Sequence, residues 1–383
     1  MEERVAEALL RGDGETQILA ARRLCRLTSS LRHNLAHRGV IAPLISMLRS
    51  RDFDTIEAAL FALLSLSSGS ERNKIRIAES GALPVLLKLL RCESDSIFDL
   101  VVASLLILSS CTANKLEIAD TGAIQLLIEI LNTQSITLSV QAKQDIIATL
   151  HNLSASHQII PSLVLSGAIP SLIQLFYNSD KSSELAEKAM ALLERIVSSS
   201  EIALEETAAT TGSVQALVEA LEEGSPLCKE YAVGVLVLIC NSCRERYRGM
   251  ILREGVMPGL LQLGLDGTWR AREMARALLL LLRDCSGGGS RTKQRKNALL
   301  EEAMERIDAE ERMGAALRLV EETIAKAQPE APKGNCPARL KNSVPWQTYI
   351  AQIQCRIIGS WGQISNPIPK SSGEASSSLS EYL

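Results

Sequence analysis

A six-residue phrase that begins with glycine occurs six times in the sequence at nearly even intervals. The copies are GVIAPL from Gly39, GALPVL from Gly81, GAIQLL from Gly122, GAIPSL from Gly167, GSVQAL from Gly212 and GVMPGL from Gly255. Successive copies start 41 to 45 residues apart. A period of this length is typical of helical solenoids, in which each repeat is too small to bury its own apolar face and stacks on its neighbours. The sequence therefore predicts an all-α stack of repeats.

The stretch 72–110 shows the expected pattern of one repeat. A short helix, RNKIRIAES, comes first, with Asn73 as its expected N-cap and Gly81 as its end. LPVLLKLLRC is the second helix, with Pro84 in the first turn, where a missing N–H costs no hydrogen bond. DLVVASLLILSS is the third and most apolar helix. Each repeat is thus expected to contain a short, a medium and a long helix.

Third helices of this kind can be found seven times along the chain. They are LAARRLCRLTSS, IEAALFALLSLSS, DLVVASLLILSS, KQDIIATLHNLSAS, EKAMALLERIVSSS, KEYAVGVLVLICNS and REMARALLLLLRD. Their apolar residues cover more than one stripe, as expected for helices that have neighbours on both sides. We therefore predict about seven repeats, the first represented mainly by its last helix.

Composition limits the function classes. The net charge of the 383-residue chain is −3, which provides no strong field for nucleic acid, so no nucleic-acid partner is expected. The nine cysteines are scattered and odd in number, which favours a reducing compartment. The early acids and the lack of an uninterrupted apolar core in the first twenty residues argue against a secretory signal, and the longest apolar run, 277–282, is too short to span a bilayer. We expect a monomer in the cytoplasm, with the nucleus as the alternative.

The repeat pattern resembles armadillo repeats, and most of all the armadillo region of plant U-box ubiquitin ligases. The residues that show this are the segments NKIRIAESGALPVLLKLL and NKLEIADTGAIQLLIEIL, and the stretch GTWRAREMARALLLLLR, which is similar to that family's closing repeat with Trp269 in place of proline. The resemblance covers about residues 1–285 and implies a right-handed armadillo (ARM) solenoid. No U-box-like stretch is recognisable, so we expect the chain not to act as an enzyme by itself. The alternative is a ubiquitin ligase whose U-box is missing from this sequence.

The armadillo resemblance also implies where a partner would bind, because third helices line the concave groove in that family. An asparagine near the end of the third helix pairs with an extended peptide there, and the aligned residues here are Arg26, Ser65, Ile107, Asn152, Arg195, Leu238 and Leu281. Four residues earlier, where nuclear-import receptors place tryptophan, stand Arg22, Phe61, Ala103, Ala148, Ala191, Gly234 and Ala277. Only Asn152 matches, so a nuclear-import receptor for basic signals is not expected. His151, beside Asn152, is expected to form hydrogen bonds in the groove.

A third row of residues lies eight positions before the asparagine row and is mostly acidic. It comprises Ile18, Glu57, Asp99, Gln144, Glu187, Glu230 and Glu273. The favoured interpretation is that these acids lie in the first turns of the third helices, where the helix dipole stabilises negative charge. The alternative is an acidic edge of the groove that prefers basic partner segments.

Other chemically suggestive patterns do not support a catalytic, metal or cofactor site. Cys240-x-x-Cys243 has no second pair at zinc-ligand spacing, and the pair His33 and His37 lacks the glutamate of a zinc-protease helix. The glycines at 287–289 have no phosphate-loop context and favour a flexible joint. The basic run 291–296 is interpreted as the solvated start of a helix, with a localisation signal or a lipid-binding patch as alternatives. We expect no cofactor and no metal.

The full prediction divides the chain into four parts. Residues 1–285 form the armadillo solenoid, 286–296 a Gly/basic linker, 297–328 an amphipathic helical cap and 329–383 a mostly disordered tail. A partner helix or a short coiled coil is the alternative for the cap. The predicted function is a protein-interaction scaffold that binds partner segments in the groove, in ubiquitin-linked regulation or signalling. A transport or cytoskeletal adaptor is a further alternative.

Overall fold

The computed structural model describes residues 2–92, 94–133 and 138–283, and every regular element in these ranges is a helix. The long third helices are α2 (Gly14–Cys25), α5 (Phe53–Ser67), α8 (Asp95–Ser109), α11 (Val140–Ser154), α14 (Glu184–Ser199), α17 (Pro226–Ser242) and α20 (Trp269–Leu282). The second helices are α1 (Glu2–Arg11), α4 (Ile41–Met47), α7 (Ala82–Leu89), α10 (Ala123–Asn132), α13 (Ala168–Tyr177), α16 (Ser213–Glu223) and α19 (Met257–Asp266). The repeats are numbered 1 to 7 below by their third helix.

The first helices are shorter and occur in repeats 2 to 7. They are α3 (Ser29–His37), α6 (Glu71–Glu79), α9 (Lys115–Asp120), α12 (Ile160–Leu165), α15 (Glu201–Ala209) and α18 (Arg244–Arg253). One 3₁₀ turn, η1 (Thr112–Asn114), precedes α9, and another, η2 (His157–Ile159), precedes α12. The prediction of seven repeats is confirmed. Repeat 1 also contains its second helix, α1, whose residues Val5, Ala6 and Leu9 are buried.

The glycine of the repeated phrase marks the same backbone turn in every copy. All six glycines, from Gly39 to Gly255, have φ between 77° and 82°, in the left-handed region that residues with a Cβ rarely adopt. Each lies between a first helix and the second helix of the same repeat. The phrase therefore recurs because the chain turns there once per repeat, by 70° between His157–Leu165 and Ala168–Tyr177.

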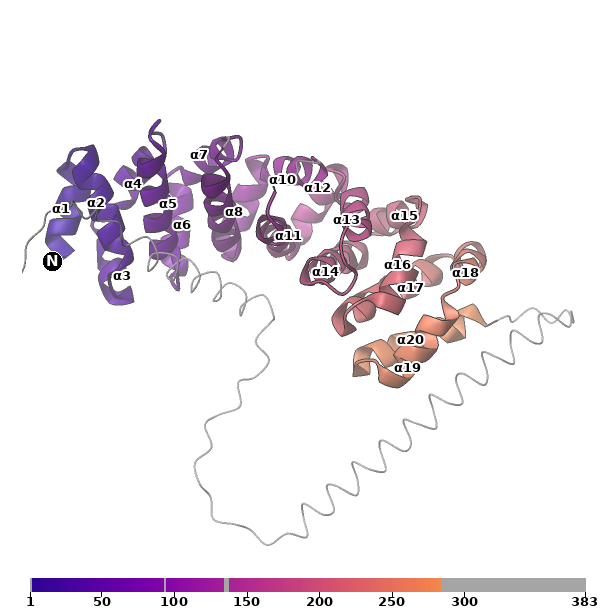
Figure 1. Cartoon of the computed structure of the whole chain (residues 1–383). Helices are drawn as coiled ribbons and strands as arrows, with labels where there is room; N and C mark the ends of the chain where they lie inside the picture. The colour runs from indigo at the N-terminus through magenta and orange to yellow at the C-terminus, as the bar shows by residue number, and fades with distance from the viewer. Residues whose placement is uncertain (1, 93, 134–137, 284–383) are drawn as a thin grey trace, which may run out of the picture. The chain divides into compact units, whose positions relative to one another are not determined.

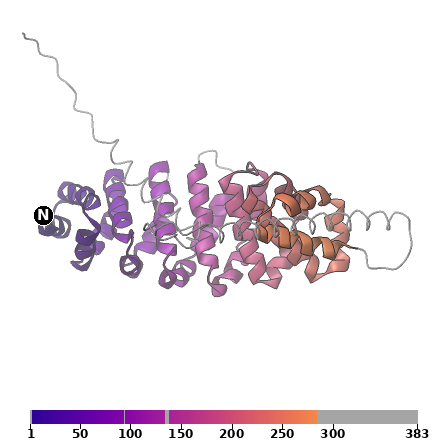
Figure 2. The ribbon, with the colours of Figure 1, turned by 90° about the horizontal axis from the view of Figure 1, so that it is seen from below.

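The third helices form one continuous row, since each contacts the third helix of the next repeat from α2 through to α20. The repeats follow one another in chain order from α1 to α20 in two views (Figure 1, Figure 2). Second helices pack on the third helices of their own repeats. The apolar pattern of the third helices is explained by this arrangement, because neighbouring repeats and the second helices cover most of their surface.

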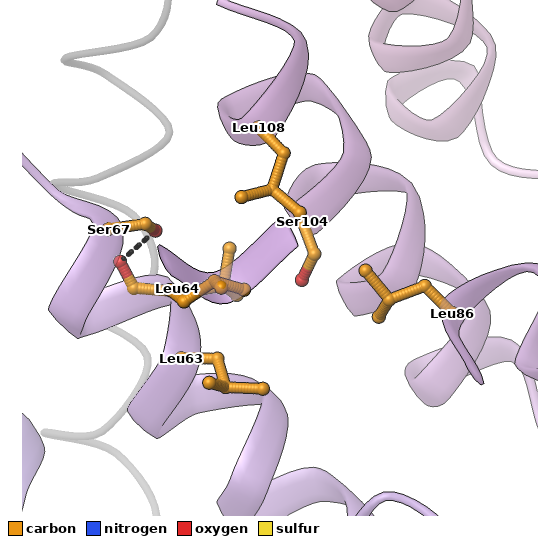
Figure 3. Close-up of a pocket in the computed structure, with 7 residues that line it drawn as sticks. Leu63, Leu64, Ser67, Leu86, Ser104 and Leu108 are labelled. Atoms are coloured by element: carbon orange, nitrogen blue, oxygen red, sulfur yellow. Dashed lines mark hydrogen bonds between the residues drawn. The ribbon is translucent and has the colours of Figure 1, made fainter. Parts of the chain in front are cut away.

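The packing between repeats 2 and 3 is dense. Leu63 and Leu64 of α5, Leu86 of α7, and Ser104 and Leu108 of α8 surround a pocket of only about 10 Å³, near the smallest space that holds a water molecule (Figure 3). The Ser104 hydroxyl donates to Leu100 O (2.8 Å) in its own helix, so the polar group inside this interior is satisfied.

The prediction of Asn73 as an N-cap is wrong. Ser70 caps α6, and its hydroxyl accepts a hydrogen bond from the backbone N–H of Asn73. The Asn73 side chain is buried, and its Nδ2 donates to Leu66 O (2.8 Å) near the end of α5. Asn114 lies at the equivalent position of the next repeat, and its Nδ2 donates to Leu108 O (3.2 Å) of α8. These two asparagines fix the path of the chain from a third helix into the following repeat.

Two further predictions concern the C-terminal region and the absence of a membrane-spanning helix. The linker, helical cap and tail predicted for 286–383 lie outside the described residues. Within the described residues, no single helix is long and apolar enough to cross a membrane; two bent helix pairs, Asp95–Ser109 with Thr112–Asp120 and His157–Leu165 with Ala168–Tyr177, meet the test by length and composition only.

Candidate partner-binding face

The three predicted rows lie on one side of the third helices, because positions four apart on a helix share a face. We call this side the third-helix face. Its middle row is small and almost fully buried in repeats 3 to 6, where it consists of Ala103, Ala148, Ala191 and Gly234. The two flanking rows are more open. The face therefore has a middle row of small residues, called its floor below, between two rows of larger, mostly polar side chains.

In repeats 1 and 2 the middle row holds larger residues. Arg22 is half-buried, and Phe61 is buried with 7% of its surface exposed. Phe61 therefore contributes mainly to packing between repeats, and it offers a partner little surface.

The residues aligned with Asn152 near the ends of the third helices, called the asparagine row, differ in exposure and in side-chain type. Arg26 and Arg195 are exposed, Ser65 and Asn152 are half-buried, and Ile107 is buried. Within this row, the two arginines offer the most surface to a partner.

Asn152 is engaged with the neighbouring repeat. Its Nδ2 donates to Ser109 Oγ (3.1 Å) and lies 3.5 Å from Leu106 O, both in α8. The family resemblance implies an asparagine directed at a peptide. Here its amide joins α11 to the end of α8, so it stabilises the stack.

Four of the five acids in the third row accept hydrogen bonds from hydroxyl groups at the start of the next third helix. Ser96 donates to Glu57 (3.2 Å), Ser139 to Asp99 (3.3 Å), Ser225 to Glu187 (2.5 Å) and Thr268 to Glu230. We call these contacts the inter-repeat brackets. Ser139, Ser225 and Thr268 are themselves the N-caps of α11, α17 and α20.

The prediction that these acids lie in the first turns of the third helices holds only for Glu187. Glu57, Asp99, Glu230 and Glu273 are each the fifth residue of their helix, one position past the first turn, and sequence analysis also missed the brackets. The signal was available, because a serine or threonine follows each bracketed acid by 38 to 40 residues. Glu273, in the last described repeat, is exposed. Partial burial raises the pKa of Asp99, and the neighbouring charge of Asp95 adds to this, although the hydrogen bond from Ser139 opposes it.

An ion-pair network crosses the third-helix face in repeats 5 to 7. Arg270 of α20 bonds to Glu194 of α14 and to Glu230 of α17, the latter with Nη1 3.0 Å from Oε1. Both carboxylates are largely buried, with exposed side-chain fractions of 16% and 12%. Gly234 makes room for this contact, since a Cβ at that position would lie 3.2 Å from Glu194 Oε1. Arg270 therefore balances one of the two carboxylate charges in this part of the face.

A row of basic side chains comes from the first helices, each seven residues before the glycine of its repeat. Arg32 Nη1 donates to Ser65 Oγ (2.6 Å), Lys74 Nζ donates to Ser110 Oγ (2.7 Å) and Arg248 Nε donates to Leu282 O (2.7 Å). Lys115 occupies the same position in repeat 4. These side chains lie at the carboxyl ends of third helices, where a helix dipole favours positive charge. Sequence analysis did not single out this row.

Lys115, His151 and Arg195 form a basic cluster in repeats 4 and 5. Burial, followed by the charges of Arg195 and Lys115, lowers the pKa of His151 to about 4, so its imidazole is neutral near pH 7. Burial, followed by the charge of Arg195, also lowers the pKa of Lys115. Lys115 and Arg195 come from different repeats, and the charge of Arg195 acts on both Lys115 and His151.

The cysteine pair and the histidine pair that were considered as redox or metal sites both lie in the described part of the chain. Cys240 is buried and Cys243 is exposed; both are free thiols, and burial raises the pKa of Cys240. His33 and His37 approach each other with their Nε2 atoms 3.2 Å apart. Over the described ranges, no group of three or more His, Cys, Asp or Glu side chains could hold a metal ion.

The repeats are similar in sequence to those of known proteins. Residues 121–291 match the model of the plant U-box protein ARM repeat region. U-box domain-containing protein 17 of Arabidopsis thaliana is 37% identical over 276 residues, which are 70% of this chain and 36% of that protein. U-box domain-containing protein 45 of the same plant is 33% identical over 148 residues, which are 38% of this chain and 18% of that protein. The chain thus spans about a third or less of these relatives.

Solved structures support the same fold. A designed armadillo repeat protein has a TM-score of 0.55 and 22% identity, covering 63% of this chain and 99% of that one. Computationally designed armadillo repeat proteins for modular peptide recognition give a TM-score of 0.56 and 21% identity, covering 62% of this chain and 99% of the designed one. At this identity, the likeness shows the fold alone.

Proposed function

The described part of the chain folds as armadillo repeats, and residues 121–291 match the repeat region of plant U-box proteins; from this premise we propose that the third-helix face binds an extended segment of a partner protein. The observation that most supports the proposal is the form of that face. A floor of small residues such as Ala148 and Ala191 lies between rows of polar side chains. Such a surface leaves space for a main chain and offers side chains for hydrogen bonds and charge contacts.

The relatives and the designed proteins support the same proposal. Designed armadillo proteins built for modular peptide recognition use this fold, and the relatives carry the U-box name. We place the chain in ubiquitin-linked regulation or signalling, in the cytoplasm or nucleus. Its contribution there is recognition, and bond-making is left to other components.

A second candidate is the partner-recognition part of a U-box ubiquitin ligase. The observation that favours it is the length of the relatives, of which this chain spans 18% to 36%. The two candidates share one mechanism at the third-helix face. They differ in whether a U-box is joined to the repeats, and a ubiquitin-transfer assay of the full-length gene product with a conjugating enzyme distinguishes them.

The proposal is tested by photo-crosslinking followed by affinity measurement. A photoreactive amino acid replaces Ser65 on the third-helix face or, as control, the exposed Gln125 on α10. We expect segments crosslinked only from the position of Ser65, and a synthetic copy of such a segment should bind the purified protein. Changing Asn152 and Arg195 together to alanine should weaken that binding while helical content, measured by circular dichroism, is retained. Equal crosslinking from both positions, or unchanged affinity in the double variant, would move the site off this face.

A further inference from the structure

We infer that the partner segment is acidic, and that its carboxylates bind along a basic rim formed by Arg26, Arg32, Lys74, Lys115 and Arg195. This inference rests on the proposed function, and it specifies the charge of the partner segment. It is the reverse of the hypothesis of an acidic edge that prefers basic segments, so the two make opposite predictions for the same peptides.

The first step concerns the acids of the face. Glu57, Asp99, Glu187 and Glu230 each accept a hydrogen bond from the next repeat, and Glu230 also pairs with Arg270. Each carboxylate therefore already accepts one hydrogen bond within the stack, although a neutral hydroxyl leaves the negative charge of Glu57, Asp99 and Glu187 in place. A basic segment would have to compete with these contacts.

The second step concerns the bases. Arg26 and Arg195 are exposed, and Lys115 is half-buried. No ion pair joins any of these three to a carboxylate within the described part of the chain. Arg32 and Lys74 reach serine hydroxyls at the ends of α5 and α8, and a neutral hydroxyl leaves the cation's charge in place. In contrast, Arg270 on the same face in repeat 7 is paired with two glutamates.

The third step is the magnitude of the remaining charge. The carboxyl end of a helix carries roughly half an elementary negative charge, so two helix ends offset about one unit. Lys74, Lys115 and Arg195 together carry three positive charges beside the ends of α8 and α11. The negative charge of Glu71 also acts on Lys74, which offsets about one further unit. About one unit of positive charge is thus left around these three side chains, and a carboxylate can form charge-assisted hydrogen bonds with them.

The test uses the purified full chain and three fluorescent dodecapeptides, which alternate serine with glutamate, with glutamine or with lysine. Fluorescence anisotropy gives their affinities at low and at physiological ionic strength. We expect the glutamate peptide to bind best and to weaken as salt rises. Preference for the glutamine or lysine peptide, or no measurable binding of the glutamate peptide, overturns the inference.

Variants separate local recognition from net charge. Lys115→Gln with Arg195→Gln should raise the Kd of the glutamate peptide about tenfold, as expected for losing charge-assisted contacts. Arg49→Gln with Arg91→Gln removes the same charge from exposed positions just after α4 and α7, and should change the Kd less than about twofold. Lys115→Arg, which keeps the charge, should retain binding. Equal weakening in both double variants would sink the inference.

Failure of the inference can be told apart from failure of the proposed function. If segments crosslink to the third-helix face and bind there without a preference for acidic residues, the proposed function stands and the inference about charge is wrong. If nothing crosslinks to that face, both are wrong.

Discussion

At the scale of single residues, the repeat is defined by the left-handed backbone conformation of its glycine and by a few polar side chains. The six glycines share one left-handed turn, although their surroundings differ. A Cβ on Gly81 would meet nothing within 4 Å, whereas one on Gly212 would lie 2.8 Å from the hydroxyl of Tyr177. That hydroxyl donates to Gly212 O (2.7 Å) and so ties α13 to the start of α16.

The two glycines give a matched pair of substitutions. Gly81→Ala should destabilise the protein by about 1 kcal/mol, because alanine must adopt a left-handed conformation. Gly212→Ala should cost about 1 kcal/mol more, since Tyr177 must also move and its hydrogen bond is disturbed. Urea unfolding followed by circular dichroism measures both. Equal costs at the two positions would show that the contact with Tyr177 contributes nothing.

The buried imidazole of His151 makes stability depend on pH. Its pKa is about 4 in the folded protein and about 6.5 when unfolded, so the unfolded state binds more protons between these values. Stability should be complete above about pH 6.5 and fall as pH drops towards 4, by about 2 kcal/mol after allowance for solvent screening. His151→Gln should remove this part of the pH dependence in urea unfolding at pH 7 and pH 5. An unchanged slope would contradict the assignment.

At the scale of elements, the third helices are held in register by the inter-repeat brackets. Each bracket joins a carboxylate near the start of one third helix to a hydroxyl at the start of the next. The hydroxyls of Ser139, Ser225 and Thr268 thus cap their own helices and bond to the preceding repeat at the same time. One side chain therefore serves local and tertiary structure together.

A double-mutant cycle measures one bracket. Glu187→Ala, Ser225→Ala and the double variant should show a coupling energy of about 1 kcal/mol, as expected for a partly buried hydrogen bond to a charged group. Glu273→Ala, at an exposed position of the same row, should change stability by less than about 0.5 kcal/mol. Additive effects of the two bracket changes would show that the contact does not stabilise the stack.

At the scale of the whole molecule, repeats contact mainly their neighbours, so damage should spread locally. Leu108→Asp would place a charge in the interior between repeats 2 and 3, where Leu108 is 3% exposed. We expect loss of hydrogen-exchange protection in α5, α7 and α8 first, with α20 affected least. The control is Leu165→Asp, at a leucine that is 87% exposed, which should be neutral within about 0.5 kcal/mol. Uniform loss of protection along the stack would contradict the model of local repeats.

The sequence by itself determined the repeat length, the helical class, the seven third helices and the turn at each phrase glycine. These features depend on local rules, since a left-handed turn needs glycine and an apolar helix needs neighbours. It did not determine which polar side chains meet. Asn73 has the chemistry of a cap, yet the stack places it in the interior on Leu66 O; the acids at 57, 99, 187 and 230 suit a helix start, yet they bond to the next repeat. Each pairing joins one repeat to the next, across seven residues for Asn73 and 38 to 40 residues for the four acids, and only the packing of one repeat on the next decides which donor reaches which acceptor.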